Sequence, residues 1–172
     1  RMGDDQWQAI FDVHLTGTFR VLRDAFKVMR ENANRVTDEG GTPPARHIVT
    51  VSSQSGFGNL GQANYSAAKA GIAGLTRTLA IEGAMFNILA NSLAFGTIDT
   101  RLTRARESQE ERVGEAVLGI PQSARNKVLD ALPMKRPGTV DEAAGPALFL
   151  CSDLSNYVSG ALLEVNGAAH IS

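Results

Sequence analysis

The sequence predicts an α/β fold with a parallel sheet of three strands and flanking helices. Three short apolar runs of strand character alternate with segments of helical periodicity. Alternation of this kind is typical of parallel sheets with right-handed crossovers. The length of 172 residues corresponds to one domain with a substantial hydrophobic core.

Composition narrows the functional class. The chain is 43% hydrophobic and 20% charged with a formal net charge of -1, which is typical of a soluble globular protein and favours neither nucleic acid nor membrane as a partner. The single cysteine, Cys151, excludes an internal disulfide and is expected in the core. No apolar stretch is long enough to span a membrane and no secretory signal is recognised, so we expect a cytoplasmic protein. The sequence suggests no metal site.

The first segment, residues 2–30, is predicted to be one helix. Its apolar residues recur at steps of three and four, and two aspartates suit its N-terminal end. Residues 31–45 are rich in Asn, Asp, Gly and Pro, which predicts a surface loop.

Strands are predicted over residues 47–52, 87–94 and 158–165, and the first should be buried on both faces. A helix is predicted over 62–85, with Ile81 among its apolar contacts and with Arg77 and Glu82 exposed. The charged stretch 102–130 is predicted to be helical in parts and is interpreted as a solvated amphipathic helix. The last helix should begin at Thr139 with a capping box.

Tyr65 and Lys69 carry the candidate chemistry. They lie four residues apart in the predicted helix 62–85 and therefore share a face, where the ammonium can stabilise an ionised phenol. A tyrosine in this setting can pass a proton to or from a substrate oxygen. Ser53, at the end of the preceding strand, could hydrogen-bond the same oxygen. The pair alone is a weak signal, and the strand, Ser-Ser and Gly-rich loop before it strengthen the hypothesis.

Gly56, Gly58 and Gly61 match the dinucleotide pattern G-x-G-x-x-G, with Glu82 at the distance of a ribose-binding acid. However, four residues separate the strand from Gly56, whereas the pattern needs its first glycine directly after the strand. Glu82 also ends a helix instead of a strand. We interpret these glycines as a flexible wall of a substrate pocket.

Residues 52–74 resemble the catalytic loop and helix of the short-chain dehydrogenase/reductase family, closest to its 3-oxoacyl-(acyl carrier protein) reductase and hydroxyacyl or hydroxysteroid dehydrogenase members. The resemblance extends over residues 5–167 and covers only the second half of the family's domain. It implies the C-terminal part of a Rossmann-like, doubly wound parallel sheet with the N-terminal half missing. We therefore expect a fragment or truncated reading frame, with an open edge at strand 47–52 and weak binding of the adenosine half of a cofactor.

The resemblance implies further site residues. His14 stands where the family has the asparagine that completes a catalytic tetrad by holding a water; it could keep this role or simply fill a helix–sheet interface. Residues 95–100 resemble the family's Pro-Gly-x-Ile/Val-x-Thr turn, which grips the nicotinamide, although Phe95 replaces the proline and should loosen the turn. Residues 101–130 correspond to a substrate lid. The implied cofactor-binding residues are Tyr65, Lys69, Phe95, Gly96, Thr97, Ile98 and Thr100.

The sequence thus predicts an oxidoreductase that interconverts a small-molecule ketone and a secondary alcohol with NAD or NADP, Tyr65 being the proton donor or acceptor. By resemblance, helices 4–30 and 62–85 should form a homodimer or homotetramer. The principal alternative is a truncated, non-catalytic remnant that serves only as an oligomerisation module. A nucleotide-sugar epimerase or dehydratase would share the tyrosine and lysine but usually has a longer C-terminal substrate domain.

Overall fold

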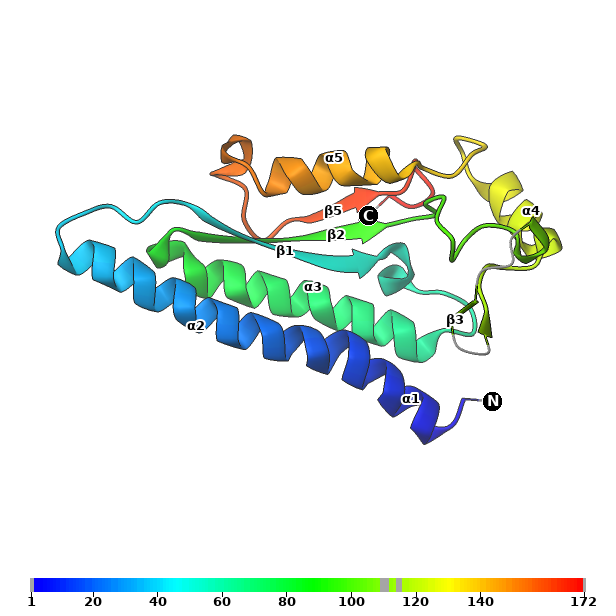
Figure 1. Cartoon of the computed structure of the whole chain (residues 1–172), viewed down its shortest axis with the longest axis horizontal. Helices are drawn as coiled ribbons and strands as arrows, with labels where there is room; N and C mark the ends of the chain where they lie inside the picture. Colours follow the sequence, from blue (N-terminus) through cyan, green and yellow to red (C-terminus); the bar gives the residue numbers. More distant parts are fainter. Residues whose placement is uncertain (1, 109–111, 114–115, 172) are drawn as a thin grey trace.

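The computed structural model describes residues 2–108, 112–113 and 116–171. At its centre is a parallel sheet of three strands, β1 (Arg46–Ser53), β2 (Ile88–Phe95) and β5 (Leu162–Val165), in the order β1-β2-β5 (Figure 1). Ser53 at the end of β1 pairs with Phe95 at the end of β2. The predicted α/β class and the strand alternation are confirmed.

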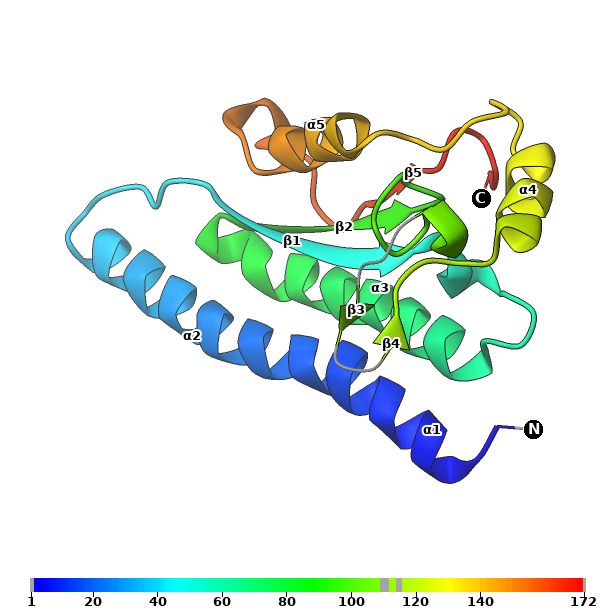
Figure 2. The same ribbon diagram turned by 45° about the vertical axis from the view of Figure 1, so that its right-hand side comes forward.

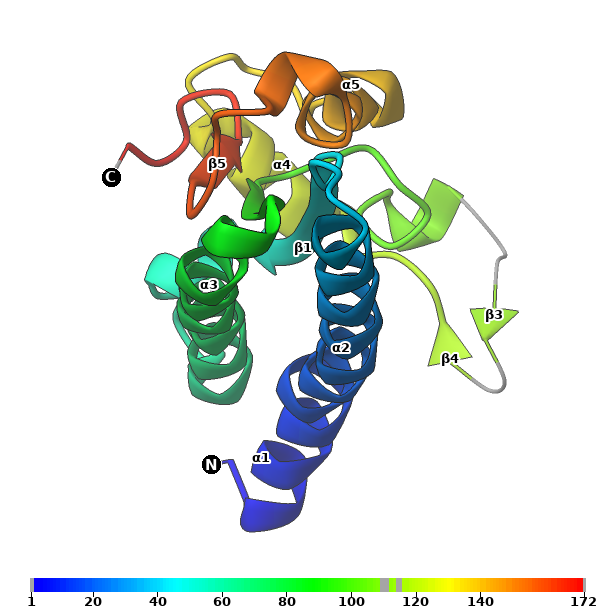
Figure 3. The same ribbon diagram turned by 90° about the vertical axis from the view of Figure 1, so that its left-hand side faces the viewer.

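Helices cover the two faces of the sheet unequally. The helix α3 (Ala63–Gly83) and the long N-terminal helix lie side by side on one face, and α5 (Val140–Leu150) lies on the other (Figure 3). Ile72 of α3, Ile88 and Leu93 of β2, and Leu150 of α5 are almost completely buried. The central strand β2 is therefore the part of the sheet that both helical layers protect.

The N-terminal helix is longer than predicted. It runs through α1 (Asp4–Ile10), a π-helical turn at Phe11–Thr16, and α2 (Gly17–Asp38). The prediction of a loop over residues 31–38 is wrong, because Ala33 is fully buried against the fold and holds this polar segment in the helix. Only residues 39–45 form the connection to β1.

The third strand is shorter than predicted, because the side chain of Asn91 occupies the segment before it. The Asn91 amide donates to the Val158 carbonyl at 2.7 Å and its oxygen accepts from the Ala161 N–H at 3.0 Å. Gly160 has a left-handed φ of 82°. Residues 158–161 thus pair with a buried side chain of β2, and strand geometry begins at Leu162.

The charged segment 102–130 is helical in parts, as predicted, but among its described residues the α-helix comes only after Pro121. Its described residues comprise the 3-10 turn Arg106–Ser108 and a small hairpin of β3 (Arg112–Val113) and β4 (Ala116–Val117). Helix α4 (Gln122–Ala131) begins only after Pro121 and lies beyond the C-terminal ends of the strands (Figure 2). Glu110 and Glu111, which we placed in the amphipathic helix, lie outside the described residues.

The structure also tests the predicted helix cap and the predicted exposure of individual side chains. The capping box at Thr139 and the exposure of Arg77 and Glu82 are confirmed. Cys151 is exposed and not in the core, because it follows the last buried residue of α5, and Ile81 is 79% exposed on the outer face of α3.

At the edge strand, Val51 is 50% exposed, so β1 is not buried on both faces. In the described part of the chain no helix is both long and apolar enough to cross a membrane.

Candidate active site

The candidate residues gather near the C-terminal end of the sheet, the edge at which ligands bind in open α/β folds. Strand β1 delivers Ser53 and its neighbour β2 delivers Phe95 to this end. Helix α3, which follows β1, carries Tyr65 and Lys69 on its N-terminal half.

Tyr65, Lys69 and His14 form one cluster. The ammonium nitrogen of Lys69 lies 5.6 Å from the centre of the Tyr65 ring, over its face. The His14 ring meets the Tyr65 ring edge-on, with 5.2 Å between centroids. The phenol is thus flanked by an ammonium group from its own helix and an imidazole from the N-terminal helix.

The π-helical turn determines where His14 lies. Within this turn Gly17 donates its N–H to the carbonyl of Asp12, five residues earlier, and the Thr18 hydroxyl donates to the His14 carbonyl at 2.6 Å. A π-turn inserts an extra residue into the helical repeat and so redirects the side chains around it. Residues of this π-helical turn pack against α3.

Lys69 is a buried cation with a specific partner. Its side-chain nitrogen donates to the Val51 carbonyl at 2.9 Å, and the residue is only 7% exposed. Burial lowers the pKa of Lys69, because low-dielectric surroundings disfavour the charged form. The pKa of His14 is lowered as well, first by burial and then by the positive charge of Lys69. Burial is thus the first cause of the lowered pKa in both groups.

The carbonyl that Lys69 binds belongs to the open edge of the sheet. The Arg46 N–H donates to the Asn87 carbonyl, so the even-numbered residues of β1 direct their backbone groups towards β2. Alternation along the strand then directs the backbone groups of Val51 away from β2. Among the described strands β1 is the last on this side of the sheet, and Lys69 donates to its outward-facing carbonyl at Val51.

Ser53 opens onto a cavity of about 370 Å³. Its hydroxyl oxygen accepts a hydrogen bond from the Ser55 N–H at 3.1 Å. Within the described chain no hydrogen bond joins Ser53 to Tyr65, and neither Tyr65 nor Lys69 lines this cavity. The hydroxyl of the neighbouring Ser52 donates to the Lys69 carbonyl at 2.8 Å. The cavity is lined by Ser53, Gln54, Ser55, Gly58, Asn59, Phe95, Gly96, Thr97, Val128, Ala131, Leu132 and Ala169.

The turn after β2 is fixed by backbone hydrogen bonds. Thr97 accepts from the Gly138 N–H at 3.0 Å, and Ile98 forms a parallel bridge to Gly138. The Thr103 hydroxyl donates to the Ile98 carbonyl and accepts from the Thr100 N–H. Phe95, Gly96 and Thr97 line the Ser53 cavity, whereas Ile98 and Thr100 do not. The turn is thus tied down despite the absence of a proline at position 95.

Sequence reasoning missed several residues that shape this site. Val51, Thr18 and Thr103 contribute through a carbonyl or hydroxyl that no motif marks. Gln54 lines the cavity next to Ser53, and its position directly after the candidate serine was the one available signal. Helix α4 supplies apolar cavity residues from a segment that we interpreted only as a lid.

Known proteins resemble this chain over almost its whole length. The family described as "Enoyl-(Acyl carrier protein) reductase" matches residues 1–170. The chain is 37% identical over 169 residues to "3-oxoacyl-(acyl-carrier-protein) reductase FabG" of Aquifex aeolicus, which covers 97% of the chain and 58% of that protein. The Thermotoga maritima protein of the same name is 36% identical, with the same coverage.

An "acetoacetyl-CoA reductase" of Synechocystis is 37% identical over 166 residues, or 95% of the chain and 59% of that protein. The chain thus spans less than two thirds of the length of these relatives.

Proposed function

The chain belongs to the short-chain dehydrogenase/reductase family, and from this we propose that it is the catalytic part of an NAD(P)-dependent oxidoreductase that interconverts a ketone and a secondary alcohol. The observation that carries the proposal is the cluster of Tyr65, Lys69 and His14 beside the C-terminal end of β1. A buried cation over a phenol ring is an arrangement suited to proton transfer at a substrate oxygen.

Tyr65 donates the proton when a carbonyl is reduced and accepts it when an alcohol is oxidised. Lys69 holds its ammonium group over the Tyr65 ring and is fixed there by its hydrogen bond to the Val51 carbonyl. Ser53, which lines the cavity, hydrogen-bonds the substrate oxygen and orients it. His14 exchanges the proton with solvent as a neutral imidazole, the form that its lowered pKa favours.

The residues present fit the nicotinamide half of the cofactor. An ammonium group has three N–H donors, and in the described chain the Val51 carbonyl takes one of them, which leaves donors for ribose hydroxyls. Phe95, Gly96 and Thr97 form a wall of the same cavity as Ser53. When bound, the cofactor supplies or removes the hydride at the carbonyl carbon. The chain's own residues bind the cofactor and the substrate, orient the substrate oxygen and exchange the proton.

The cavity suggests the substrate class. Its lining includes polar groups of Ser53, Gln54 and Asn59 and apolar side chains of Val128 in α4 and Leu132 just after it. A molecule with a ketone next to a second polar group and an apolar chain could contact both kinds of lining residue. The printed names of the relatives refer to 3-oxoacyl-carrier and acetoacetyl-CoA reduction. We therefore propose a 3-oxoacyl thioester as the substrate.

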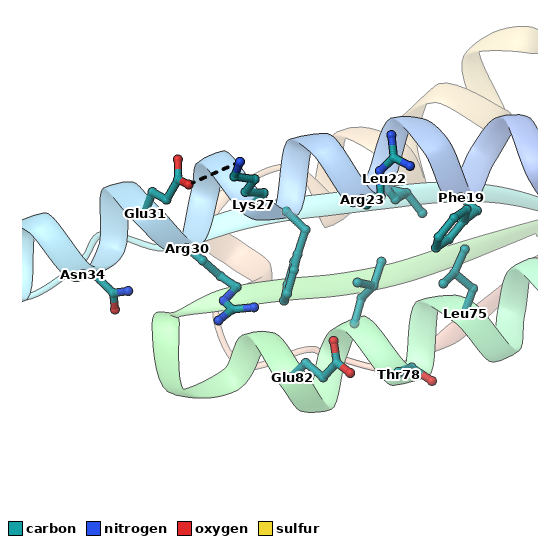
Figure 4. Close-up of a pocket in the computed structure, with 12 residues that line it drawn as sticks. Phe19, Leu22, Arg23, Lys27, Arg30, Glu31, Asn34, Leu75, Thr78 and Glu82 are labelled. Atoms are coloured by element: carbon teal, nitrogen blue, oxygen red, sulfur yellow. Dashed lines mark ion pairs between the residues drawn. The ribbon is translucent and has the colours of Figure 1, made fainter.

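We also propose self-association through the face of α2 and α3. A groove of about 510 Å³ runs between these helices, with an apolar floor and charged rims (Figure 4). Its floor includes Phe26 and Leu79, whereas Arg23, Lys27 and Glu82 lie along its rims. Rims that carry both signs of charge can pair with a second copy of the same surface.

The decisive experiment compares the two tyrosines of the chain. Tyr65→Phe removes one oxygen but retains the ring that contacts His14 and Lys69, whereas Tyr157 is fully exposed and provides the control Tyr157→Phe. With NADPH and acetoacetyl-CoA, we expect Tyr65→Phe to lower kcat by about 10²–10⁴-fold and Tyr157→Phe to leave it unchanged. Nicotinamide fluorescence should show that both variants still bind the cofactor, with the affinity of Tyr157→Phe equal to that of the wild type.

Equal rates in the two variants would refute the role of Tyr65. If the wild-type chain neither binds NAD(P)H nor turns over while its self-association persists, the oligomerisation module becomes the better description.

A further inference from the structure

The C-terminal segment 166–170 is folded back onto the loop that follows Ser53. The His170 ring stacks on Phe57, the last residue of the 3-10 turn Gln54–Phe57, with 4.0 Å between centroids and 12° between planes. On its edge, Nδ1 of His170 lies 2.8 Å from Oε2 of Glu164 in β5. One imidazole thereby joins the last strand to the loop of the candidate active site.

The turn that presents His170 is itself hydrogen-bonded. The Asn166 amide donates to the Glu164 carboxylate and to the His170 carbonyl, both at 2.9 Å. Gly167 and Ala168 have left-handed φ angles of 61° and 63°, which bend the chain sharply back. The segment thus has a defined path and ends in a side chain with two specific contacts.

This path leads to the cavity that Ser53 lines. Ala169 forms part of its wall together with Gln54 and Gly96. A Cβ atom at Gly96 would lie 2.7 Å from the Asn166 Cβ and 2.8 Å from the Gln54 Oε1, so the end of β2, the C-terminal turn and the loop after Ser53 meet within van der Waals distance. A displacement of the turn would therefore move one wall of the cavity.

We propose that His170 is a positioning residue that clasps segment 166–170 to the loop after Ser53 and thereby sets the width of the substrate cavity. The part of this proposal that concerns substrate rests on the proposed function. The side chain at position 170 makes two contacts: a flat ring stacks on Phe57, and a nitrogen at the edge of the ring reaches Glu164. Phenylalanine would make only the first contact and glutamine only the second.

The clasp can be tested without activity. Amide hydrogen exchange at residues 54–58 reports local opening of the loop. In His170→Ala we expect this exchange to accelerate by about tenfold, because both the stacking contact and the hydrogen bond are lost. His170→Phe and His170→Gln should each give an intermediate rate. Ile171→Ala, which alters an 83% exposed neighbour, should match the wild type.

Phe57→Leu provides a second route to the same result, since it removes the stack while leaving the C-terminal turn unaltered. It should accelerate exchange at residues 54–58 and shift the His170 ring-proton resonances away from their ring-current positions. Unchanged exchange in both His170→Ala and Phe57→Leu would overturn the clasp.

Kinetics test the link to substrate. For acetoacetyl-CoA we expect His170→Ala to raise KM several-fold with kcat within about twofold of wild type, because a positioning residue does not touch the reacting atoms. A longer 3-oxoacyl thioester, which fills a wider cavity, should show a smaller rise in KM. Equal KM values in wild type and His170→Ala, or a fall in kcat alone, would refute the role in cavity width. If the wild-type chain has no turnover, the proposed function fails, whereas the exchange experiment still decides whether the clasp exists.

Discussion

Substitution of alanine for glycine at two positions of α3 should have opposite effects on stability. Gly83 ends α3 where the helix meets the start of β2, and a Cβ atom there would lie 2.7 Å from the Ile88 carbonyl oxygen and 3.2 Å from the Phe26 ring. Gly74 lies in the middle of the same helix, and its Cβ would meet nothing within 4 Å. The pair therefore separates the cost of steric crowding from the intrinsic preference of alanine for helices.

The magnitudes follow from this geometry. Gly74→Ala should stabilise the chain by about 0.5–1 kcal/mol, the advantage of alanine over glycine within a helix. Gly83→Ala gains less from propensity, because it is the last helical residue. Its methyl group must also displace a backbone oxygen in a fully buried strand, and such overpacking costs about 1–3 kcal/mol. We expect a net loss of about 1–2 kcal/mol, or a fall in Tm of about 3–6 °C for a chain of this length.

Urea unfolding followed by circular dichroism measures both variants against the wild type. Because Gly74 is exposed on a helix that we propose to mediate association, each titration should be repeated at two protein concentrations, so that any contribution from assembly is recognised. If Gly83→Ala proves as stable as Gly74→Ala, the close packing of α3 on β2 described above is incorrect.

Two further predictions concern titration and exposure. The pKa of His14 lies below its usual 6.5, so the unfolded chain binds this proton more readily; the stability that neutral His14 preserves is present above pH 6.5 and is lost as the pH falls through the folded-state pKa. Urea midpoints at pH 7.5 and 5.5 should therefore differ less in His14→Asn than in the wild type, and an equal difference would contradict the burial of His14. Cys151 should react with a thiol reagent in the native protein without denaturant, whereas a reaction that required unfolding would restore the predicted core position.

The features of the fold that depend on local sequence could be predicted. The β-branched run of β1 and the Ala- and Gly-rich pattern of α3 indicated their elements within one or two residues. The errors occurred where tertiary contacts override local preference. A polar composition predicted a loop after residue 30, but buried Ala33 extends the helix to Asp38, and the side chain of Asn91 shortens β5.

The site shows the same division. Helical spacing was sufficient to place Tyr65 and Lys69 together, because four residues make about one turn. It could not indicate that the ammonium would bind Val51, since that contact depends on β1 being an edge strand. Nor could the sequence reveal the His170 contact with Phe57, because the two residues are more than a hundred positions apart and no motif connects them.

The buried charge of Lys69 is expected to lower the stability of the folded chain. Burial lowers its pKa, which means that the folded state disfavours its charge, and Lys69→Met would relieve this while retaining the volume of the side chain. The freed carbonyl belongs to Val51, which is half exposed on the edge strand, so water can replace the lost hydrogen bond. We therefore expect Lys69→Met to be more stable than the wild type at pH 7, by about 1 kcal/mol, although it should lose activity.

The pH dependence provides the control for this interpretation. Wild-type stability should rise as the pH increases from the lowered folded-state pKa of Lys69 towards the ordinary 10.5, because in this range the unfolded chain binds a proton that the folded chain has released. This rise should be absent in Lys69→Met, and Lys127→Met on the exposed surface of α4 should retain it. A marked loss of stability in Lys69→Met at pH 7 would show that the bond to Val51 outweighs the cost of burying the charge, and the lysine would then be a structural tie for the edge strand.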